Sequence, residues 1–298
     1  ATGTNNIAIG YGAFDAADAG EDDNIAIGLN ALGDANHAST VRNIAIGSGA
    51  MDYIAGIQGA NQDNIFIGHD AGGGQWATAV SQYNIGIGSY AMDDAMYGAL
   101  YNTGIGYAAL GALTQGDQNT VVGYQAGDAI NTGSWNILMG VNTGGSITTG
   151  GENTFLGSGA GASLTTGTTN IAVGSGSLDA AAVGESGNVA IGQNAMGAVD
   201  EGSNAGSDTV SADHNVAIGY QALLGGDMGD ASSSSGAHRD FGGNIAIGAY
   251  ALDATATNPM NGTVAIGHQS LTALTGAGNN GHHNVAINHG ALNANISG

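Results

Sequence analysis

A short motif, NIAIG or a close relative, recurs along the whole chain and restricts the folds that are open to it. Successive copies start 17 to 29 residues apart, so a nearly constant core of nine residues is followed by a spacer of variable length. Repeats of this size stack into a solenoid, in which each coil pairs with the coils next to it. The fifteen copies begin at Asn6, Asn24, Asn43, Asn64, Asn84, Asn102, Asn119, Asn136, Asn153, Asn170, Asn188, Asn215, Asn244, Thr263 and Asn284.

The residues of one copy alternate in character, and we count their positions from the motif asparagine as position zero. Position one is Ile, Val or Thr, position three is aliphatic, and position four is Gly in fourteen copies and Asn288 in the last. β-Branched residues with a period of two, closed by a turn residue, predict a short strand over positions one to three. We expect a second short strand around positions six to eight. The predicted fold is an all-β, parallel β-solenoid (β-roll) of about fifteen coils, forming a single domain over residues 1–298.

Positions two and eight compensate each other in size. Position two is Ala or Gly in eleven copies whose position eight is large, as in Ala26 with Leu32, and the sizes are reversed in four copies, as in Phe66 with Gly72. Two side chains that share a cavity must keep their summed volume constant, so we expect both positions inside the coil. Positions one and three then point outward, although the opposite assignment of the faces is the alternative.

Two outward rows of Ile and Val would form a larger apolar surface than a soluble monomer usually exposes. A repeating apolar stripe is covered most simply by the same stripe on other copies of the chain, arranged around a rotation axis. We therefore expect the chain to form a homo-oligomer.

The composition excludes several classes of partner and chemistry. The chain has 24 acidic residues, two basic residues and no cysteine, for a formal net charge of -22. Disulfides and cysteine-based zinc sites are therefore excluded, and binding to nucleic acid or anionic lipid is disfavoured because both need dense Lys and Arg. The apolar runs are shorter than the roughly 18 residues that cross a bilayer, so we expect no membrane insertion by this chain. The acidic excess suits an extracellular or saline setting.

Catalytic signals are weak. The sequence GSGAGA at residues 157–162 satisfies the letters of a dinucleotide-binding fingerprint, but no helix is expected after it. No nucleophile elbow stands out either. We expect a protein that is not an enzyme and has no cofactor.

Two kinds of cation site are open. His268 and His289 share position five of adjacent coils, so their rings could lie about 5 Å apart and hold a metal ion, or simply stack as exposed polar residues. Carboxylates in the spacers could bind divalent cations loosely, or only solvate the surface. These carboxylates are Asp22, Asp23, Asp93, Asp94, Asp200 and Glu201.

The motif asparagines are interpreted as a structural ladder rather than a binding site, because stacked Asn side chains hydrogen-bond along the coil axis and satisfy turn backbone groups. The ladder would comprise Asn6, Asn24, Asn43, Asn64, Asn84, Asn102, Asn119, Asn136, Asn153, Asn170, Asn188, Asn215, Asn244 and Asn284.

The two longest spacers, at residues 197–214 and 224–243, are expected to be inserted surface loops. The second contains Ser233, His238, Arg239 and Phe241, an aromatic and basic combination that no other spacer has. Recognition residues are often on exposed loops of a rigid scaffold, so these four residues are our candidates for ligand contact.

The repeated strings, such as NIAIGLNAL at residues 24–32 and NVAIGYQAL at residues 215–223, resemble the head repeats of trimeric autotransporter adhesins. Similar repeats occur in phage tail fibres. The resemblance implies a left-handed β-roll and a homotrimer with the motif strand near its axis. The present spacers are longer and more variable than the adhesin repeat, and the sequence shows neither a heptad stalk nor a membrane anchor.

The expected function is that of an extracellular or cell-surface subunit of a structural and adhesive fibre, which forms a stiff rod or filament and attaches to a surface, a host receptor or a glycan. A trimeric receptor-binding head and a phage or virus tail-fibre shaft are alternatives, and an ice-binding solenoid would need regular outward Thr residues. The motifs run from Asn6 to Leu292 with no room for polar caps. We therefore expect either a piece of a longer protein or head-to-tail polymerisation into a filament.

Overall fold

The computed structural model confirms an all-β fold and describes residues 3–17, 20–35, 39–54, 61–76, 79–180, 184–199, 212–225, 242–253, 261–272 and 283–293. Within these ranges there is no helix, and every strand has three residues at positions one to three of a motif. The strands are β1 (Ile7–Ile9), β2 (Ile25–Ile27), β3 (Ile44–Ile46), β4 (Ile65–Ile67), β5 (Ile85–Ile87), β6 (Thr103–Ile105), β7 (Thr120–Val122), β8 (Ile137–Met139), β9 (Thr154–Leu156), β10 (Ile171–Val173), β11 (Val189–Ile191), β12 (Val216–Ile218), β13 (Ile245–Ile247), β14 (Val264–Ile266) and β15 (Val285–Ile287).

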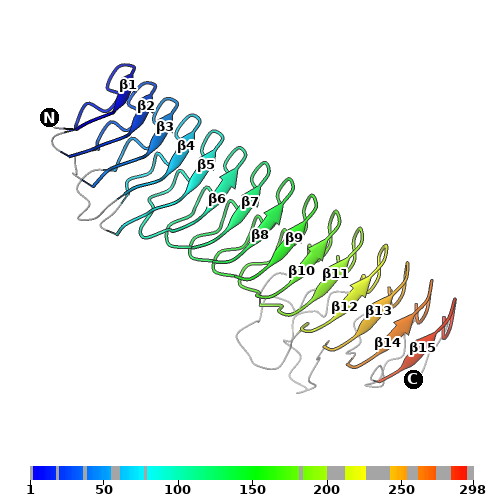
Figure 1. Ribbon diagram of the computed structural model, residues 1–298. Coiled ribbons are helices and arrows are strands. Elements are labelled where there is room, and N and C mark those ends of the chain that lie inside the picture. The colour runs from blue at the N-terminus through cyan, green and yellow to red at the C-terminus, as the bar shows by residue number, and fades with distance from the viewer. Residues whose placement is uncertain are drawn as a thin grey trace, which may run out of the picture. The chain divides into compact units, whose positions relative to one another are not determined.

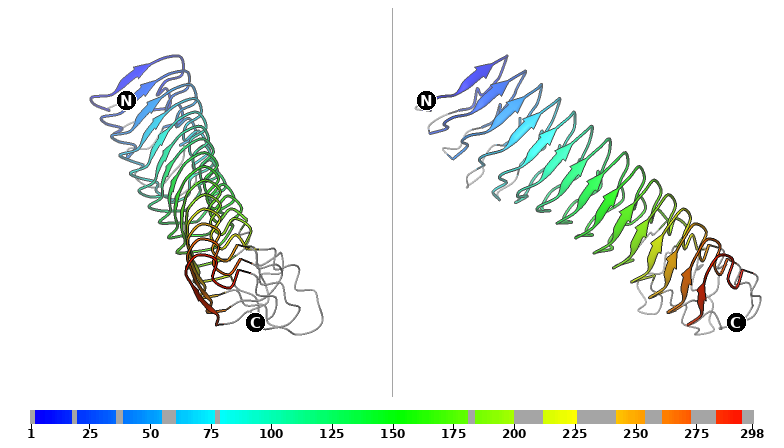
Figure 2. Two further views of the ribbon diagram at one scale, coloured as in Figure 1. Left: turned by 90° about the vertical axis from the view of Figure 1, so that its right-hand side faces the viewer. Right: turned by 45° about the vertical axis from the view of Figure 1, so that its right-hand side comes forward.

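The chain divides into two compact units, Ala1–Asn142 and Thr143–Gly298. The first unit contains β1 to β8 and the second contains β9 to β15 (Figure 1). Within each unit, consecutive strands pair in parallel with equivalent residues opposite each other, as Ile44 lies opposite Ile65. Figure 2 shows, for each unit, the strands following one another in a single row. Each unit is therefore a parallel β-solenoid, as predicted.

Each strand from β2 to β15 has one buried and two outward positions, whereas β1 is exposed at all three. Position two is fully buried, for example at Ala45, Phe66 and Leu138. The flanking positions of the same strands are half-buried or exposed, and Ile137 and Met139 of β8 remain 47% and 51% exposed. The assignment of positions one and three to the outer face is therefore confirmed. We call the surface made by positions one and three the outer strand face.

Positions two and eight meet inside the coil. A Cβ atom added to Gly72 would lie 2.7 Å from Cδ1 of Phe66, and one added to Gly161 would lie 2.2 Å from Cε2 of Phe155. Real Cβ atoms do not approach other heavy atoms so closely, so a large residue at position two requires glycine at position eight. The size compensation in the sequence thus reflects a shared cavity.

The glycine at position four is required for two reasons, its backbone conformation and its contact with the next coil. At Gly47 the backbone has φ +140°, a conformation that L-residues rarely adopt. A Cβ atom there would also lie 2.1 Å from the carbonyl oxygen of Gly68 in the next coil. The chain turns here while adjacent coils are in backbone contact, which explains why the motif ends in glycine.

The prediction of a second strand around positions six to eight was wrong. Asn30 at position six has φ 51° and Leu32 at position eight has φ 55°, so both lie in the left-handed region instead of the extended one. The segment forms a turn whose backbone still bonds the next coil, since the Leu32 N–H donates to the Ala50 carbonyl at 2.9 Å. Each described coil therefore has one short strand followed by left-handed turns.

Candidate functional site

The outer strand face consists mainly of aliphatic side chains, several of which are exposed. None of the fifteen strands has a charged side chain at position one or three, although the chain has a formal net charge of -22. In the first unit this neutral face is bordered by exposed aromatic side chains. They are Tyr83, Tyr101 and Trp135 just before the motif, and Tyr107 and Tyr124 at position five.

Aromatic rings on neighbouring coils of the first unit contact one another in a row at positions five and six. The ring centroids of His69 and Tyr90 are 5.3 Å apart, those of Tyr90 and Tyr107 are 5.6 Å apart, and those of Tyr107 and Tyr124 are 5.3 Å apart. Such aromatic pairs each stabilise the stacking of coils by about 0.5 to 1.5 kcal/mol. We did not predict this row. The sequence pattern that indicates this row is a Tyr or His at position five or six of each successive coil.

A second aromatic row lies in the second unit. Tyr220 and Tyr250 are 5.3 Å apart, Tyr250 and His268 are 6.0 Å apart, and His268 and His289 are 5.1 Å apart with an angle of 14° between their planes. The sequence predicted only the last contact, at about 5 Å. Both histidines are exposed, so this row ends in two stacked imidazoles at the surface.

The motif asparagines form hydrogen-bonded ladders in the interior. The Asn119 side-chain oxygen accepts from both the backbone N–H and the side chain of Asn136, each at 3.0 Å, and its amide nitrogen donates to Asn102 at 3.0 Å. The same nitrogen donates to the Gly133 carbonyl at 2.9 Å, three residues before the next motif asparagine. The equivalent bond from Asn188 reaches Ala212, so the asparagines fasten the ends of both short and long spacers.

The second unit contains one interruption of this ladder. Thr263 takes the place of asparagine in the β14 coil, and its backbone N–H still donates to the Asn244 side-chain oxygen at 3.0 Å. In the next coil the side-chain nitrogen of Asn284 has no hydrogen-bond partner among the described residues. Thr263 therefore interrupts the asparagine-to-asparagine side-chain bonds on both sides of the β14 coil.

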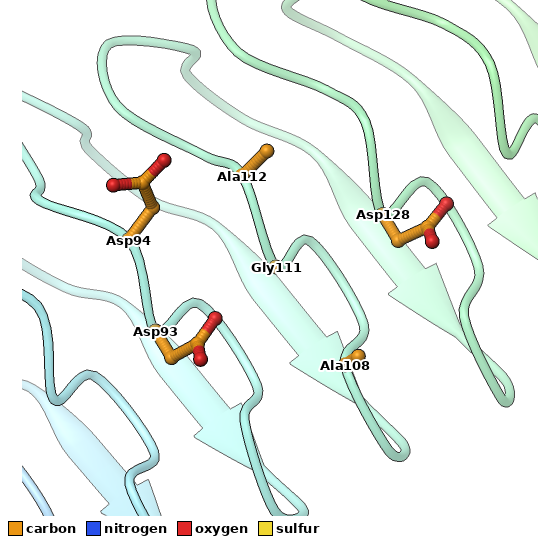
Figure 3. Close-up of a pocket in the computed structure, with 6 residues that line it drawn as sticks. All are labelled: Asp93, Asp94, Ala108, Gly111, Ala112 and Asp128. Atoms are coloured by element: carbon orange, nitrogen blue, oxygen red, sulfur yellow. The ribbon is translucent and has the colours of Figure 1, made fainter.

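Carboxylates line a hollow on the turn side of the first unit. Figure 3 shows Asp93 and Asp128 at equivalent places of two coils, with Gly111 of the intervening coil between them and Asp94 beside Asp93. Burial raises the pKa of Asp93 and of Asp128 above the ordinary aspartate value. Among the described residues, no three His, Asp or Glu side chains are grouped so that they could hold a metal ion.

The other candidate carboxylates are dispersed. Asp22 accepts hydrogen bonds from the backbone and the hydroxyl of Thr4, and these bonds lower its pKa. Asp23 accepts from the side chain of Asn5 at 2.9 Å. Asp200 and Glu201 lie outside the described residues. Neither Asp22 nor Asp23 lines the hollow beside Asp93.

The candidate ligand contacts Ser233, His238, Arg239 and Phe241 also lie outside the described residues, as does most of each long spacer. Their role stays a prediction from the sequence.

Comparison with known proteins adds no relative to these observations, because no protein-family model, curated protein or solved structure matches the chain. Within the described ranges, no helix is long and apolar enough to cross a membrane.

Proposed function

We propose that the chain is a non-enzymatic subunit of an extracellular structural and adhesive fibre, in which copies of the chain associate through the outer strand face. One observation carries the proposal, namely that this face is uncharged in every coil, and aliphatic except for Thr103, Thr120 and Thr154, while the chain as a whole is strongly acidic. Like-charge repulsion disfavours contacts elsewhere on such a surface, and the neutral face is free of it.

The energetics support an assembly rather than a monomer. Burying the exposed half of an Ile side chain such as Ile137 stabilises a complex by about 1 kcal/mol. Two rows of such residues over the strands of one unit together reach the roughly 4 to 15 kcal/mol that association costs in lost translational and rotational freedom. The flanking aromatic residues add further apolar area at the same border.

The proposed arrangement is a homotrimer with left-handed coils, which is what the resemblance to adhesin head repeats implies. Attachment through the 224–243 spacer, with Arg239 and Phe241, would make the same assembly a receptor-binding head. Head-to-tail contact between assemblies is the proposed route to a longer filament, and a tail-fibre shaft would use the same outer face. The proposed role needs no cofactor.

The proposal is tested by the mass of the protein in solution. Size-exclusion chromatography with light scattering should give a multiple of 28.9 kDa for the unmodified chain. Ile137→Asp should shift the mass toward one chain, because each copy would bring a buried charge into the interface. The matched control is Gln115→Asp, which adds the same charge at an exposed spacer position away from the strands. A single-chain mass at every concentration, or equal behaviour of the two variants, would contradict the proposal.

A further inference from the structure

The second aromatic row ends in a pair of stacked histidines that the proposed function does not use. His268 and His289 occupy position five of the neighbouring β14 and β15 coils, whose strands pair in register. Their rings are parallel to within 14° and 5.1 Å apart, and both side chains are exposed. Among the described residues, no ring nitrogen of His268 or His289 takes part in a hydrogen bond or ion pair. By contrast, Nδ1 of the exposed His69 pairs with the Asp70 carboxylate at 3.0 Å. The imidazoles of the pair are therefore available as ligands.

We propose that His268 and His289 form a two-histidine site for a divalent transition-metal ion, Cu²⁺, Ni²⁺ or Zn²⁺, which bridges the two coils. Neutral imidazole nitrogens suit these ions, whereas Ca²⁺ and Mg²⁺ require oxygen ligands. No third His, Asp or Glu joins the pair in the described part of the chain. Water molecules would complete the coordination, so the site is open and exchangeable.

The geometry requires a small and specific movement. A metal ion about 2.1 Å from each nitrogen can join nitrogens no more than about 4.2 Å apart, and about 3.4 Å apart in a tetrahedral site. The centroids of the stacked rings are 5.1 Å apart, so the rings must tilt until one nitrogen of each comes within this limit. Both side chains are exposed. Among the described residues, the one other ring contact that this tilt disturbs is the edge contact of His268 with Tyr250.

The position of the pair gives such a site a structural consequence. The same two coils are joined at Thr263 and Asn284, where the asparagine ladder is interrupted. An ion that binds both histidines links these coils from outside and binds only when they are stacked. It therefore stabilises the stacked state by mass action. The site would act as a metal-dependent clip between the two coils whose Asn284 amide nitrogen has no hydrogen-bond partner among the described residues.

The site can be tested with Zn²⁺, which is diamagnetic, by calorimetry and by NMR of the histidine rings. One equivalent of Zn²⁺ should shift the ring resonances of His268 and His289 together, and the same concentration of Ca²⁺ should leave them in place. His268→Ala and His289→Ala should each weaken Zn²⁺ binding at this site by at least about tenfold, because the second imidazole of a chelate acts at high effective concentration.

The matched control is His69→Ala, which removes an exposed histidine of the other aromatic row and should leave Zn²⁺ binding unchanged. Acidification should release the ion, because protons compete for the same nitrogens. Ring resonances that stay in place with Zn²⁺ on the unmodified protein would overturn the proposal, whether or not the variants fold. Equal Zn²⁺ affinity of the unmodified chain and both single variants would overturn it as well.

Discussion

The interior of the β4 coil offers a direct test of the packing, because Phe66 and Gly72 share one cavity. The Phe66 ring is fully buried, and a Cβ atom on Gly72 would already lie 2.7 Å from it. Gly72→Leu therefore overpacks the coil, while Phe66→Ala leaves a cavity. The double variant restores the combination of Ala and Leu that the β2 coil has at Ala26 and Leu32.

The magnitudes follow from these contacts. Overpacking by Gly72→Leu costs about 1 to 3 kcal/mol. Gly72 also has a φ of +62°, and placing a leucine in this left-handed conformation costs about 1 to 2 kcal/mol more. Phe66→Ala costs about 3 to 5 kcal/mol. Simple addition predicts about 5 to 10 kcal/mol for the double variant. We expect only about 2 to 4 kcal/mol, because the overpacking disappears and the new side chain fills most of the cavity.

Guanidinium unfolding followed by circular dichroism measures these differences. Gly159→Leu is the control for backbone strain alone, because Gly159 has φ +67° and nothing lies within 4 Å of the added Cβ atom. Gly72→Leu should cost more than this control by the overpacking term. A double variant as unstable as the sum of the two single variants would refute the shared cavity.

Three further outcomes are expected. Thr263→Asn should raise the free energy of unfolding by about 1 kcal/mol, because it supplies the acceptor that Asn284 lacks; an unchanged denaturation midpoint would contradict this. Burial raises the pKa of Asp93 in the folded chain, so its ionised form opposes folding and stability should rise as the pH falls through the raised value toward 3.8. Asp93→Asn should raise the melting temperature at pH 7 and flatten this pH dependence, and a lower melting temperature would count against it. Deleting residues 230–241 shortens the 29-residue repeat between Asn215 and Asn244 to 17 residues, a length found elsewhere in the chain. The stability of the variant should change little, and its attachment to surfaces should fall. Unaltered attachment would show that this spacer is not the contact region.

The strands and their faces could be predicted because each depends on residues within one repeat. Alternation fixed position two as buried and position three as exposed, and the reversal of sizes at Phe66 and Gly72 identified the cavity that they share. The spacing of the asparagines along the chain does not affect these local rules. The parallel solenoid then follows from the repetition alone.

The turns and the aromatic rows were not predicted, for two different reasons. Positions seven and eight hold mostly alanine and larger apolar residues, as at Ala31 and Leu32, and such a pair is compatible with a strand as well as with these left-handed turns. Asn30 and Asp70 at position six favour the left-handed conformation and were the signal available. The rows depend on which side chains meet across coils, and Tyr90 at position six reaches Tyr107 at position five. Residues 226–241 have no repeat pattern from which a structure could be argued.

The central claim is that other copies of the chain cover the outer strand face, and Met139 reports on this directly. Among the described methionines it alone is exposed, at 51%, whereas Met51, Met92, Met96 and Met196 are fully buried in the coils. Peroxide oxidises exposed methionine to the sulfoxide. The extent of oxidation of the peptide that contains Met139, measured by mass spectrometry, therefore reports the exposure of this face. In the assembled protein at high concentration, Met139 should be protected and should become reactive on dilution or in the Ile137→Asp variant. Oxidation of Met139 at the rate of a free methionine at every protein concentration would contradict the account.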